Sequence, residues 1–405
     1  MKIYSLKQIE TPRLLIRPLK LGDEIEINQA INRSLEILQR WMPWAEDPSL
    51  ETTKDFVYRN VNAWKCGQSK EFPLVAVLKA ENKIVSATGY NDRSELTRPY
   101  FEIGYWIDSN YQGRSLVTEL VNALTRYALD GLKATRVQLS TQTDNIKSLG
   151  VAKRCGFVQE ALLKNYCIDC VSNKPADSYL YACCDTSSLP GLEVKFEHHE
   201  KFDFEEADNQ IKQKSDNPIL LPLFETDRLR LTPPTIKSAE EMMQALTASL
   251  NEVGQWFTWA SPKTTVEHVR QHMKEGMDAA VDINAHQYLF YLVRDKVNDT
   301  FLGEVWLKTN ELPMVTINYW FDTRQTGQGY ATESVRELVR YAFVDLKVRR
   351  IQLHAAETNS KSIKLAKRLG FTHEGTMKGA SRNFLSDEVV ASEIFSMCDL
   401  SELRL

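Results

Sequence analysis

The chain carries one sequence pattern twice at a constant spacing, and this repeat constrains its architecture more than any other feature. The segment "YWIDSNYQGRSLVTEL" at 105–120 aligns with "YWFDTRQTGQGYATES" at 319–334, and "NIKSLGVAKRCGF" at 145–157 aligns with "NSKSIKLAKRLGF" at 359–371. Both alignments have an offset of 214 residues, and the second is identical at eight of thirteen positions. Self-similarity of this kind indicates two copies of one folding unit. A chain of 405 residues also exceeds the size that one hydrophobic core usually organises.

The repeat sets the predicted domain boundaries. The heads "ETPRLLI" at 10 and "ETDRLRL" at 225 match, as do "WMPWA" at 41 and "WFTWA" at 256. We therefore predict an N-terminal domain at 1–185, a linker at 186–222 and a C-terminal domain at 223–405. The linker is polar and charged, and its His198 and His199 stand among glutamates. A solvated segment is the preferred interpretation of these histidines, over a metal site.

Composition excludes several classes of function. A net charge of -4 provides no basic field of the kind that gathers nucleic acid. No apolar run approaches the roughly 20 residues that a membrane span needs, and the chain's start has no signal-peptide core with a cleavage site. We expect a cytoplasmic protein without nucleic-acid or membrane partners.

The seven cysteines favour reduced thiols, since the count is odd and no secretion signal is present. Cys167 and Cys170 form a CxxC pair, and Cys183 and Cys184 follow, so four thiolates could in principle bind zinc. Adjacent side chains on a strand point to opposite faces, however. We therefore prefer buried small apolar residues in a hairpin and predict no metal site.

Each copy has a mixed pattern that predicts an α+β fold with a mixed sheet. Alternating runs predict strands, and each glycine-containing loop is followed by helical spacing of apolar residues. A second helix is predicted at 361–369, ending at Gly370 because glycine is common just past a helix end. The apolar helix positions are Val117, Leu120, Val121 and Leu124 in copy one, and Val335, Leu338, Val339, Ala342 and Phe343 in copy two.

The glycine loop of copy two has the features of an anion site. A loop that turns from a strand into a helix presents several backbone N–H groups, supported by the helix dipole. Gly327 and Gly329 allow the backbone to approach a ligand closely. The loop lacks both GK[ST] and GxGxxG, so a nucleotide P-loop and a dinucleotide fingerprint are excluded. By itself the pattern fits a phosphate site or a plain tight turn.

The neighbouring motifs add a family resemblance. The RxxGxG of Arg324–Gly329 is followed about thirty residues later by a strand, an asparagine and a helix that ends in GF. This combination resembles the GNAT acyl-CoA N-acyltransferases. The "ETxRL" heads, the WxxW segments, "YWxD", "NxKSxxxAKRxGF" and "EGTMKGA" at 374–380 resemble the RimJ/RimL branch in particular. The resemblance covers nearly all of both domains.

The resemblance implies a splayed mixed sheet flanked by helices, with acetyl-CoA between two diverging strands and its pyrophosphate on the loop. It implies acetyl transfer to a primary amine by direct attack, which needs a proton acceptor, an oxyanion donor and a proton for the thiolate. The implied cofactor-binding residues are Phe321, Arg324, Gln325, Thr326, Gly327, Gln328, Gly329, Tyr330, Ala331, Asn359 and Ser362 in copy two, and Ile107, Gly113, Arg114, Ser115, Asn145 and Ser148 in copy one.

The proton donor is expected on the second helix. Many GNAT enzymes place a tyrosine four residues after the serine of this helix, but Ala152 and Ala366 occupy that position here. Ser362, with Ser148 in copy one, is therefore the candidate donor, as the branch suggests. Asparagine and serine are also ordinary helix caps, so capping is the alternative reading of these helix starts.

The proton acceptor has two candidates. Glu102 stands on the strand before the loop of copy one, where several GNAT enzymes carry a base, but copy two has Thr316 there. His354 stands on the opposite strand of copy two, where copy one has Ser140. A glutamate on a strand usually faces solvent and a lone strand histidine is usually structural, so either residue could instead be ordinary surface or core.

Four tryptophans are candidate substrate contacts. Trp41 and Trp44, with Trp256 and Trp259, lie on an early helical segment that borders the acceptor pocket in this branch. Aromatic pairs usually pack in a core, so they form either packing or an aromatic wall for a cation.

The two copies differ in which part of the machinery they keep. Copy one has Asn110 and Ser115 in place of Arg324 and Gly329, and an added side chain at Ser115 is expected to crowd the phosphate. We therefore predict the C-terminal domain as the acetyl-CoA site. The chain is expected to be a monomer whose domains act as a pseudo-dimer, with copy one helping to shape the acceptor cleft. The alternative is a non-catalytic acetyl-CoA sensor or protein-binding module. The sequence does not select among protein N-termini, polyamines and other small amines.

Overall fold

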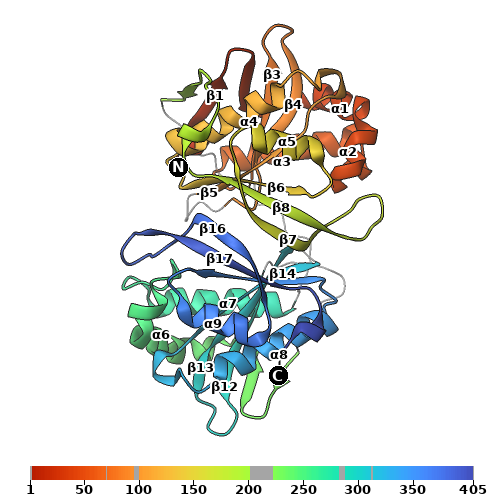
Figure 1. Ribbon diagram of the computed structural model, residues 1–405. Helices are drawn as coiled ribbons and strands as arrows, with labels where there is room; N and C mark the ends of the chain where they lie inside the picture. The colour runs from red at the N-terminus through yellow and green to blue at the C-terminus, as the bar shows by residue number, and fades with distance from the viewer. Residues whose placement is uncertain are drawn as a thin grey trace. The chain divides into compact units, whose positions relative to one another are not determined.

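The computed structural model describes residues 2–69, 71–94, 100–200, 222–281, 288–311 and 313–404. The chain divides into two compact units, one built mainly from residues before the linker and the other mainly from residues after it. Each unit holds a mixed sheet with helices against it (Figure 1). The two units are described separately below.

The N-terminal unit has a sheet in the order β9–β1–β2–β3–β4–β5–β6–β8–β7, in which only the β5–β6 pair is parallel. Its strands are β1 (Leu6–Glu10), β2 (Leu14–Pro18), β3 (Phe72–Leu78), β4 (Lys83–Tyr90), β5 (Tyr100–Tyr105), β6 (Arg136–Gln142), β7 (Val158–Ile168), β8 (Pro175–Cys183) and β9 (Lys195–His198). Its helices are α1 (Asp23–Arg33), α2 (Leu35–Trp41), α3 (Leu50–Lys65), α4 (Leu116–Arg126) and α5 (Ile146–Arg154).

The C-terminal unit repeats this order as β10–β11–β12–β13–β14–β15–β17–β16, with β14–β15 as the parallel pair. Its strands are β10 (Phe224–Glu225), β11 (Leu229–Thr232), β12 (Tyr288–Asp295), β13 (Phe301–Glu311), β14 (Met314–Phe321), β15 (Arg350–Ala356), β16 (Thr372–Arg382) and β17 (Val389–Met397). Its helices are α6 (Ala239–Val253), α7 (Val266–Val281), α8 (Tyr330–Val344) and α9 (Ser360–Leu369).

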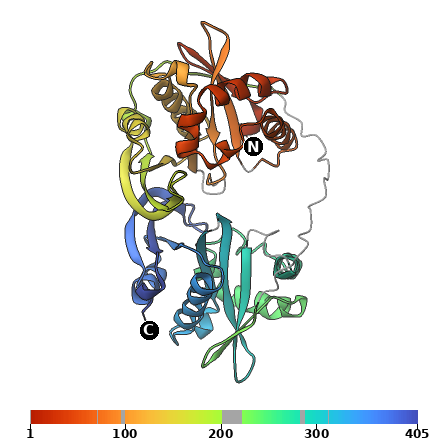
Figure 2. The ribbon, with the colours of Figure 1, turned by 90° about the vertical axis from the view of Figure 1, so that its right-hand side faces the viewer.

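The helices of the C-terminal unit pack into two separate apolar clusters. Residues of α8 and α9 join one cluster with the sheet, and residues of α6 and α7 join another. Because side chains alternate along a strand, Tyr319 and Trp320 of β14 belong to different clusters. Figure 2 gives a second view of the helices against the sheet. The α+β class with a mixed sheet is confirmed.

The sheet splays in each unit, and the splay begins at a defined residue pair. Parallel pairing of β5 with β6 ends at Glu102 and Gln138, and pairing of β14 with β15 ends at Thr316 and Gln352. Beyond these pairs the strands continue without pairing to each other. The parallel strands therefore open into a V on the side where the glycine loop follows β14.

Two local expectations have clear outcomes. The helix α9 ends at Leu369, and Gly370 has the left-handed backbone (φ 95°) that closes it, as predicted. The linker prediction is wrong for Lys195–His198, which form β9 and pair with β1. His198 lies beside Ser5, with 3.0 Å between Nδ1 and Oγ, and is thus part of the N-terminal unit rather than of a solvated segment.

Candidate active site

The glycine loop of the C-terminal unit has the backbone of an anion cradle. Gly327 and Gly329 both adopt left-handed conformations (φ 86° and 85°), and Gly329 is the residue from which α8 begins. The first turn of α8 receives no side-chain cap, so its free N–H groups stay available. A Cβ added at Gly327 would meet no atom within 4 Å, so the space over the loop is open.

The N-terminal loop keeps the same backbone in spite of its changed sequence. Gly113 has φ 76°, and Ser115 adopts φ 59° and ψ 14°, close to the conformation of Gly329. A Cβ at Gly329 would lie 3.4 Å from the Arg228 guanidinium, which is ordinary contact. The serine therefore costs some backbone strain but leaves the turn intact.

The buried aspartate before each loop is neutralised by a different arginine. Arg324 donates through Nε and Nη2 to Asp322, at 3.0 and 2.5 Å to Oδ2. In the N-terminal unit Arg33, at the end of α1, donates to Asp108 at 3.0 and 2.6 Å. Both aspartates are at most 2% exposed. The loss of an arginine at Asn110 is thus compensated from another helix, and the leading arginine of the loop serves the buried aspartate.

The "ETxRL" head forms a brace for the loop, a role that the sequence did not reveal. Arg228 donates from Nε to Glu333 Oε2 at 2.8 Å and from Nη1 to the Gln328 carbonyl at 3.0 Å, while Thr226 Oγ1 donates to Glu333 Oε1. Glu333 lies in the first turn of α8. We call Thr226, Arg228 and Glu333 the loop brace.

The N-terminal unit contains the same brace. Arg13 donates to Glu119 at 2.6 Å and to the Arg114 carbonyl at 2.9 Å, and Thr11 donates to Glu119 at 2.7 Å. The signal was the match between the two heads. The glutamate that each head arginine contacts lies 105 residues further along the chain in the C-terminal unit and 106 in the N-terminal unit, so the sequence alone could not identify it.

The predicted asparagines act as helix caps. Asn359 Oδ1 accepts from the Ser362 N–H at 3.1 Å, and Asn145 Oδ1 accepts from the Ser148 N–H at 3.2 Å. Capping is thus part of their role, and it fixes the orientation of each serine. Ser362 and Ser148 are half-buried and lie one turn into the helix.

A tyrosine that sequence reasoning missed accompanies each serine. Tyr319 of β14 lies near Ser362, and Tyr105 of β5 lies near Ser148. Burial raises the pKa of each tyrosine to about 12, while the adjacent serine hydroxyl opposes this rise. Both hydroxyls therefore remain protonated at neutral pH, so each keeps a proton that it could donate. The tyrosine of the repeated "YW" pair was the available signal.

Glu102 does not face solvent. It is 1% exposed, and its carboxylate accepts from Gln138 Nε2 and from Ser140 Oγ, both at 2.7 Å. Arg93 lies 3.4 Å from the same carboxylate. Glu102 therefore ties together the two strands at the vertex of the V. In the C-terminal unit Gln352 donates to Thr316 Oγ1 at 3.0 Å, and the half-buried His354 replaces Ser140 on the diverging strand.

The tryptophans combine packing and exposure. Trp44 is 46% exposed and contacts Trp106, whereas Trp259 packs on Trp320 with 6.0 Å between ring centroids. Trp259 also lines a cavity of about 410 Å³ between α6 and α7. Trp41 lies under the Arg40 guanidinium at 4.4 Å, and Trp256 is half-buried.

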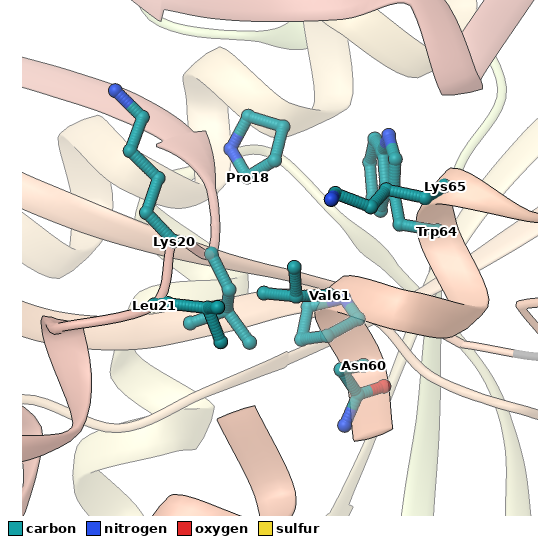
Figure 3. Close-up of a pocket in the computed structure, with 9 residues that line it drawn as sticks. Pro18, Lys20, Leu21, Asn60, Val61, Trp64 and Lys65 are labelled. Carbon is teal, nitrogen blue, oxygen red and sulfur yellow. The ribbon is translucent and has the colours of Figure 1, made fainter. Parts of the chain in front are cut away.

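A second cavity lies in the N-terminal unit, away from the predicted site residues. It has about 270 Å³ and lies between the end of β2 and α3 (Figure 3). Lys20 and Lys65 flank its apolar walls, which include Val61 and Trp64.

The cysteines do not share one environment. Cys183 is buried, but Cys167 and Cys170 are half-buried and Cys184 is exposed, so the expectation of buried residues holds for Cys183 alone. All seven thiols are free. Across the described residues, no group of three or more histidine, cysteine or acidic side chains is arranged to hold a metal ion.

Comparison with known protein families decides the assignment. The profile described as acetyltransferase (GNAT) domain matches twice, at residues 13–158 and 228–372. The chain belongs to the GNAT acetyltransferase family. Each match includes the arginine and the glutamate of a loop brace, a glycine loop and an Asn-capped helix. The tandem arrangement and the RimJ/RimL-like branch are confirmed.

Two curated relatives each match a part of this chain about as long as one domain. The chain is 29% identical over 137 residues to the ribosomal-protein-serine acetyltransferase of Escherichia coli K12, covering 34% of this chain and 74% of that protein. It is 28% identical over 175 residues to the uncharacterized N-acetyltransferase YnaD of Bacillus subtilis 168, covering 43% and 95%. A solved structure of RimL, a ribosomal L7/L12 α-N-protein acetyltransferase with coenzyme A, aligns with a TM-score of 0.41 and 19% identity, covering 44% and 99%.

The family assignment makes the chain an acetyltransferase, and the acetyl donor of this family is acetyl-CoA. The open, uncapped loop of the C-terminal unit fits the pyrophosphate of that donor, since an anion could accept from the first-turn N–H groups. Among the described residues, no helix is both long and apolar enough to cross a membrane.

Proposed function

We propose that the C-terminal domain binds acetyl-CoA and transfers its acetyl group to a primary amine. The observation that carries this proposal is the loop of Gly327 and Gly329, which is open to solvent and held by the loop brace. The N-terminal loop has a similar backbone and is equally open over Gly113, so the preference for the C-terminal loop rests on Gly329, where copy one has Ser115.

Acetyl-CoA supplies an activated thioester carbonyl. Ser362 is the proposed donor to the departing sulfur, and the Asn359 cap, which accepts from the Ser362 backbone N–H, supports this role. Tyr319, a buried and protonated hydroxyl beside Ser362, supports that donation. His354 is the proposed acceptor of the amine proton in this domain, and Glu102 is its counterpart in the N-terminal domain.

The acceptor is proposed to be a protein N-terminus, because one of the relatives is named a ribosomal-protein-serine acetyltransferase. Polyamines and other small amines are the alternatives. The chain is further proposed to be a monomer, and sedimentation analysis would test that state directly.

Titration with acetyl-CoA tests which loop binds. We expect one strong site in the intact chain, unaffected by Gly113→Trp and lost in Gly327→Trp, because a bulky side chain would fill the open space over the loop. Isothermal titration measures both affinity and stoichiometry. Both glycines have positive φ, so the two variants carry similar backbone strain and control for each other.

The opposite pattern would overturn the assignment. If Gly113→Trp alone removed binding, the N-terminal domain would be the cofactor site. Two strong sites in the intact chain would mean that both loops bind. Thiol release with a panel of amines then distinguishes transfer from binding without turnover.

Tyr319→Phe tests whether the Tyr319 hydroxyl supports proton donation by Ser362. We expect kcat to fall by about a hundredfold, the lower end of what one general acid–base group contributes, while KM for acetyl-CoA changes little. Tyr105→Phe is the matched control, because it removes the corresponding hydroxyl from the other domain. Thiol release under saturating donor measures both variants, and an unchanged kcat in Tyr319→Phe would rule out this role.

A further inference from the structure

The cavity of about 410 Å³ in the C-terminal domain is not explained by the acetyl-CoA loop. It is bordered by α6, α7 and the segment around Trp259, and its size suits a small molecule. Apolar walls come from Met242, Trp259 and Val269. None of the loop residues lines it.

A buried ion pair forms part of the cavity wall. His272 Nε2 lies 2.8 Å from Glu304 Oε1, and the Trp320 indole N–H donates to Glu304 Oε2 at 3.0 Å. Glu304 is 1% exposed, whereas the His272 side chain is 38% exposed and is among the residues lining the cavity. The imidazole thus connects a fully buried carboxylate with the space inside the cavity.

Aromatic rings hold the imidazole in place on both sides. Phe290 stacks on His272 at 4.6 Å and 3°, and Trp259 stacks at 6.2 Å and 15°. Gly276 allows this packing, since a Cβ there would lie 1.8 Å from the Phe290 ring. The ring orientation is therefore fixed before any ligand arrives.

The N-terminal domain builds the same fold without this pair. The helices α3 and α7 have equal length, and Phe56 of α3 occupies the position of His272 in α7. Glu304 is the strand partner of Trp320 in the sheet. The equivalent tryptophan, Trp106, donates its backbone N–H to the Ala87 carbonyl, so Ala87 corresponds to Glu304. Phenylalanine and alanine thus fill the two positions in one copy, and histidine and glutamate fill them in the other.

This comparison argues against a purely structural role for the pair. Removing a carboxylate from water costs several kcal/mol, and an apolar pair of suitable size is often at least as stable. The Phe56 and Ala87 positions demonstrate that the fold accepts such a pair. A charged imidazole at the cavity wall is therefore better explained by a ligand.

The charges around the cavity favour an anion. Burial lowers the pKa of His272, but the nearby Glu304 and Glu275 carboxylates outweigh it and leave the pKa raised, so the protonated form is favoured. Lys263 and His268 also line the cavity, and Glu275 is the one carboxylate among the lining residues. Because His272 Nε2 already faces Glu304, an anion in the cavity would meet the other ring nitrogen of His272 and the Lys263 ammonium.

We propose that this cavity binds a carboxylate carried on a flat apolar group. The His272 imidazolium, with Lys263 and His268, would hold the carboxylate, and the Trp259 ring would pack on the apolar body. The site requires no acetyl-transfer step, so its binding test is independent of the proposed function.

Three probes with one ring and different charge test the proposal: benzoate, benzylamine and benzyl alcohol. Ligand-observed NMR titration of the full chain would give a Kd for each. We expect benzoate to bind at least about tenfold more tightly than the other two, because only its carboxylate can accept charge-assisted hydrogen bonds from the cations of the cavity wall. The double variant His272→Phe/Glu304→Ala reproduces the residues of the N-terminal domain and should lose that preference.

Two controls keep the test decisive. His268→Gln removes a lining imidazole without touching the buried pair and should weaken benzoate binding less than the double variant. The hydrogen-exchange pattern of the double variant checks that the domain is folded. Preferential binding of benzylamine, equal binding of all three probes, absence of benzoate binding, or an unchanged benzoate Kd in the folded double variant would each overturn the proposal.

Discussion

Replacing Glu304 by alanine is expected to lower the free energy of unfolding of the C-terminal domain by about 3 kcal/mol. Breaking a buried pair by removing one partner typically costs about 3–5 kcal/mol, because the other charge is left uncompensated. Glu304 is 1% exposed, but His272 is 38% exposed, so solvent screening places the expected value at the lower end, about 3 kcal/mol. The Trp320 N–H also loses its acceptor.

The double variant shows how much of the lost stability comes from the unpaired charge rather than from lost packing. His272→Phe/Glu304→Ala leaves no unpaired imidazolium, so we expect it to be about 1–2 kcal/mol more stable than Glu304→Ala alone. Asp278→Ala removes an exposed carboxylate of α7 that does not line the cavity, and is the control for a general effect of lost charge. Urea titration with hydrogen exchange of the β12–β13 peptides reports on this domain, and the β3–β4 peptides of the other domain provide an internal reference.

The difference in free energy of unfolding between the wild type and the double variant is expected to depend on pH. The pKa of His272 is raised in the folded state, so its stabilising contribution is fully present below its unfolded pKa of about 6.5. That contribution is lost as the pH rises through the folded pKa. The free energy of unfolding of the wild type, measured relative to that of the double variant, should therefore be higher at acidic than at alkaline pH. A pH-independent difference would indicate that His272 acts without its charge.

The strand and helix positions were accessible from the sequence because they depend on local periodicity. The run at 350–355 predicts β15, and Gly370 predicts the end of α9. Side-chain partners were not accessible, because pairs such as Glu102 and Gln138 come from strands 36 residues apart. The Glu102 environment was therefore misjudged even though its strand was predicted correctly.

The buried His272–Glu304 pair had no signal in the sequence for a different reason. The repeat keeps an offset of 214 residues through the loop and the second helix, but α3 and α7 differ by 216 in their bounds. Small length changes hide the correspondence of Phe56 with His272 until the sheet register is known. Tyr319 was visible as part of a repeated motif, yet its proximity to Ser362 depends on the fold.

Arg228→Ala is expected to weaken acetyl-CoA binding at the C-terminal site by about tenfold or more. The variant removes the donor to the Gln328 carbonyl, which lies between the two loop glycines, and the ion pair with Glu333. Hydrogen bonds that involve a charged group contribute about 1.5–3 kcal/mol, and each 1.4 kcal/mol corresponds to about tenfold in affinity. Because Arg228 is half exposed, solvent screening favours the lower part of that range.

The chain offers close controls for this prediction. Arg230→Ala removes a half-buried arginine two residues further along the chain, in β11, whose partners are Glu225 and Asp299, and should leave the affinity unchanged. Arg13→Ala removes the equivalent brace of the N-terminal loop. If the C-terminal domain is the strong site, only Arg228→Ala will raise the Kd for acetyl-CoA in isothermal titration.

A positioning role also makes a kinetic prediction that a structural role does not. Arg228 touches the loop and α8 rather than the V where Ser362 and Tyr319 lie, so KM for acetyl-CoA should rise while kcat at saturating donor changes little. Glu333→Gln keeps an acceptor for Thr226 and Arg228 but removes the charge, and should produce an intermediate KM. A fall in kcat with unchanged KM would instead mean that the brace acts on the reacting groups, and an unchanged KM and kcat would mean that the loop keeps its backbone without the arginine.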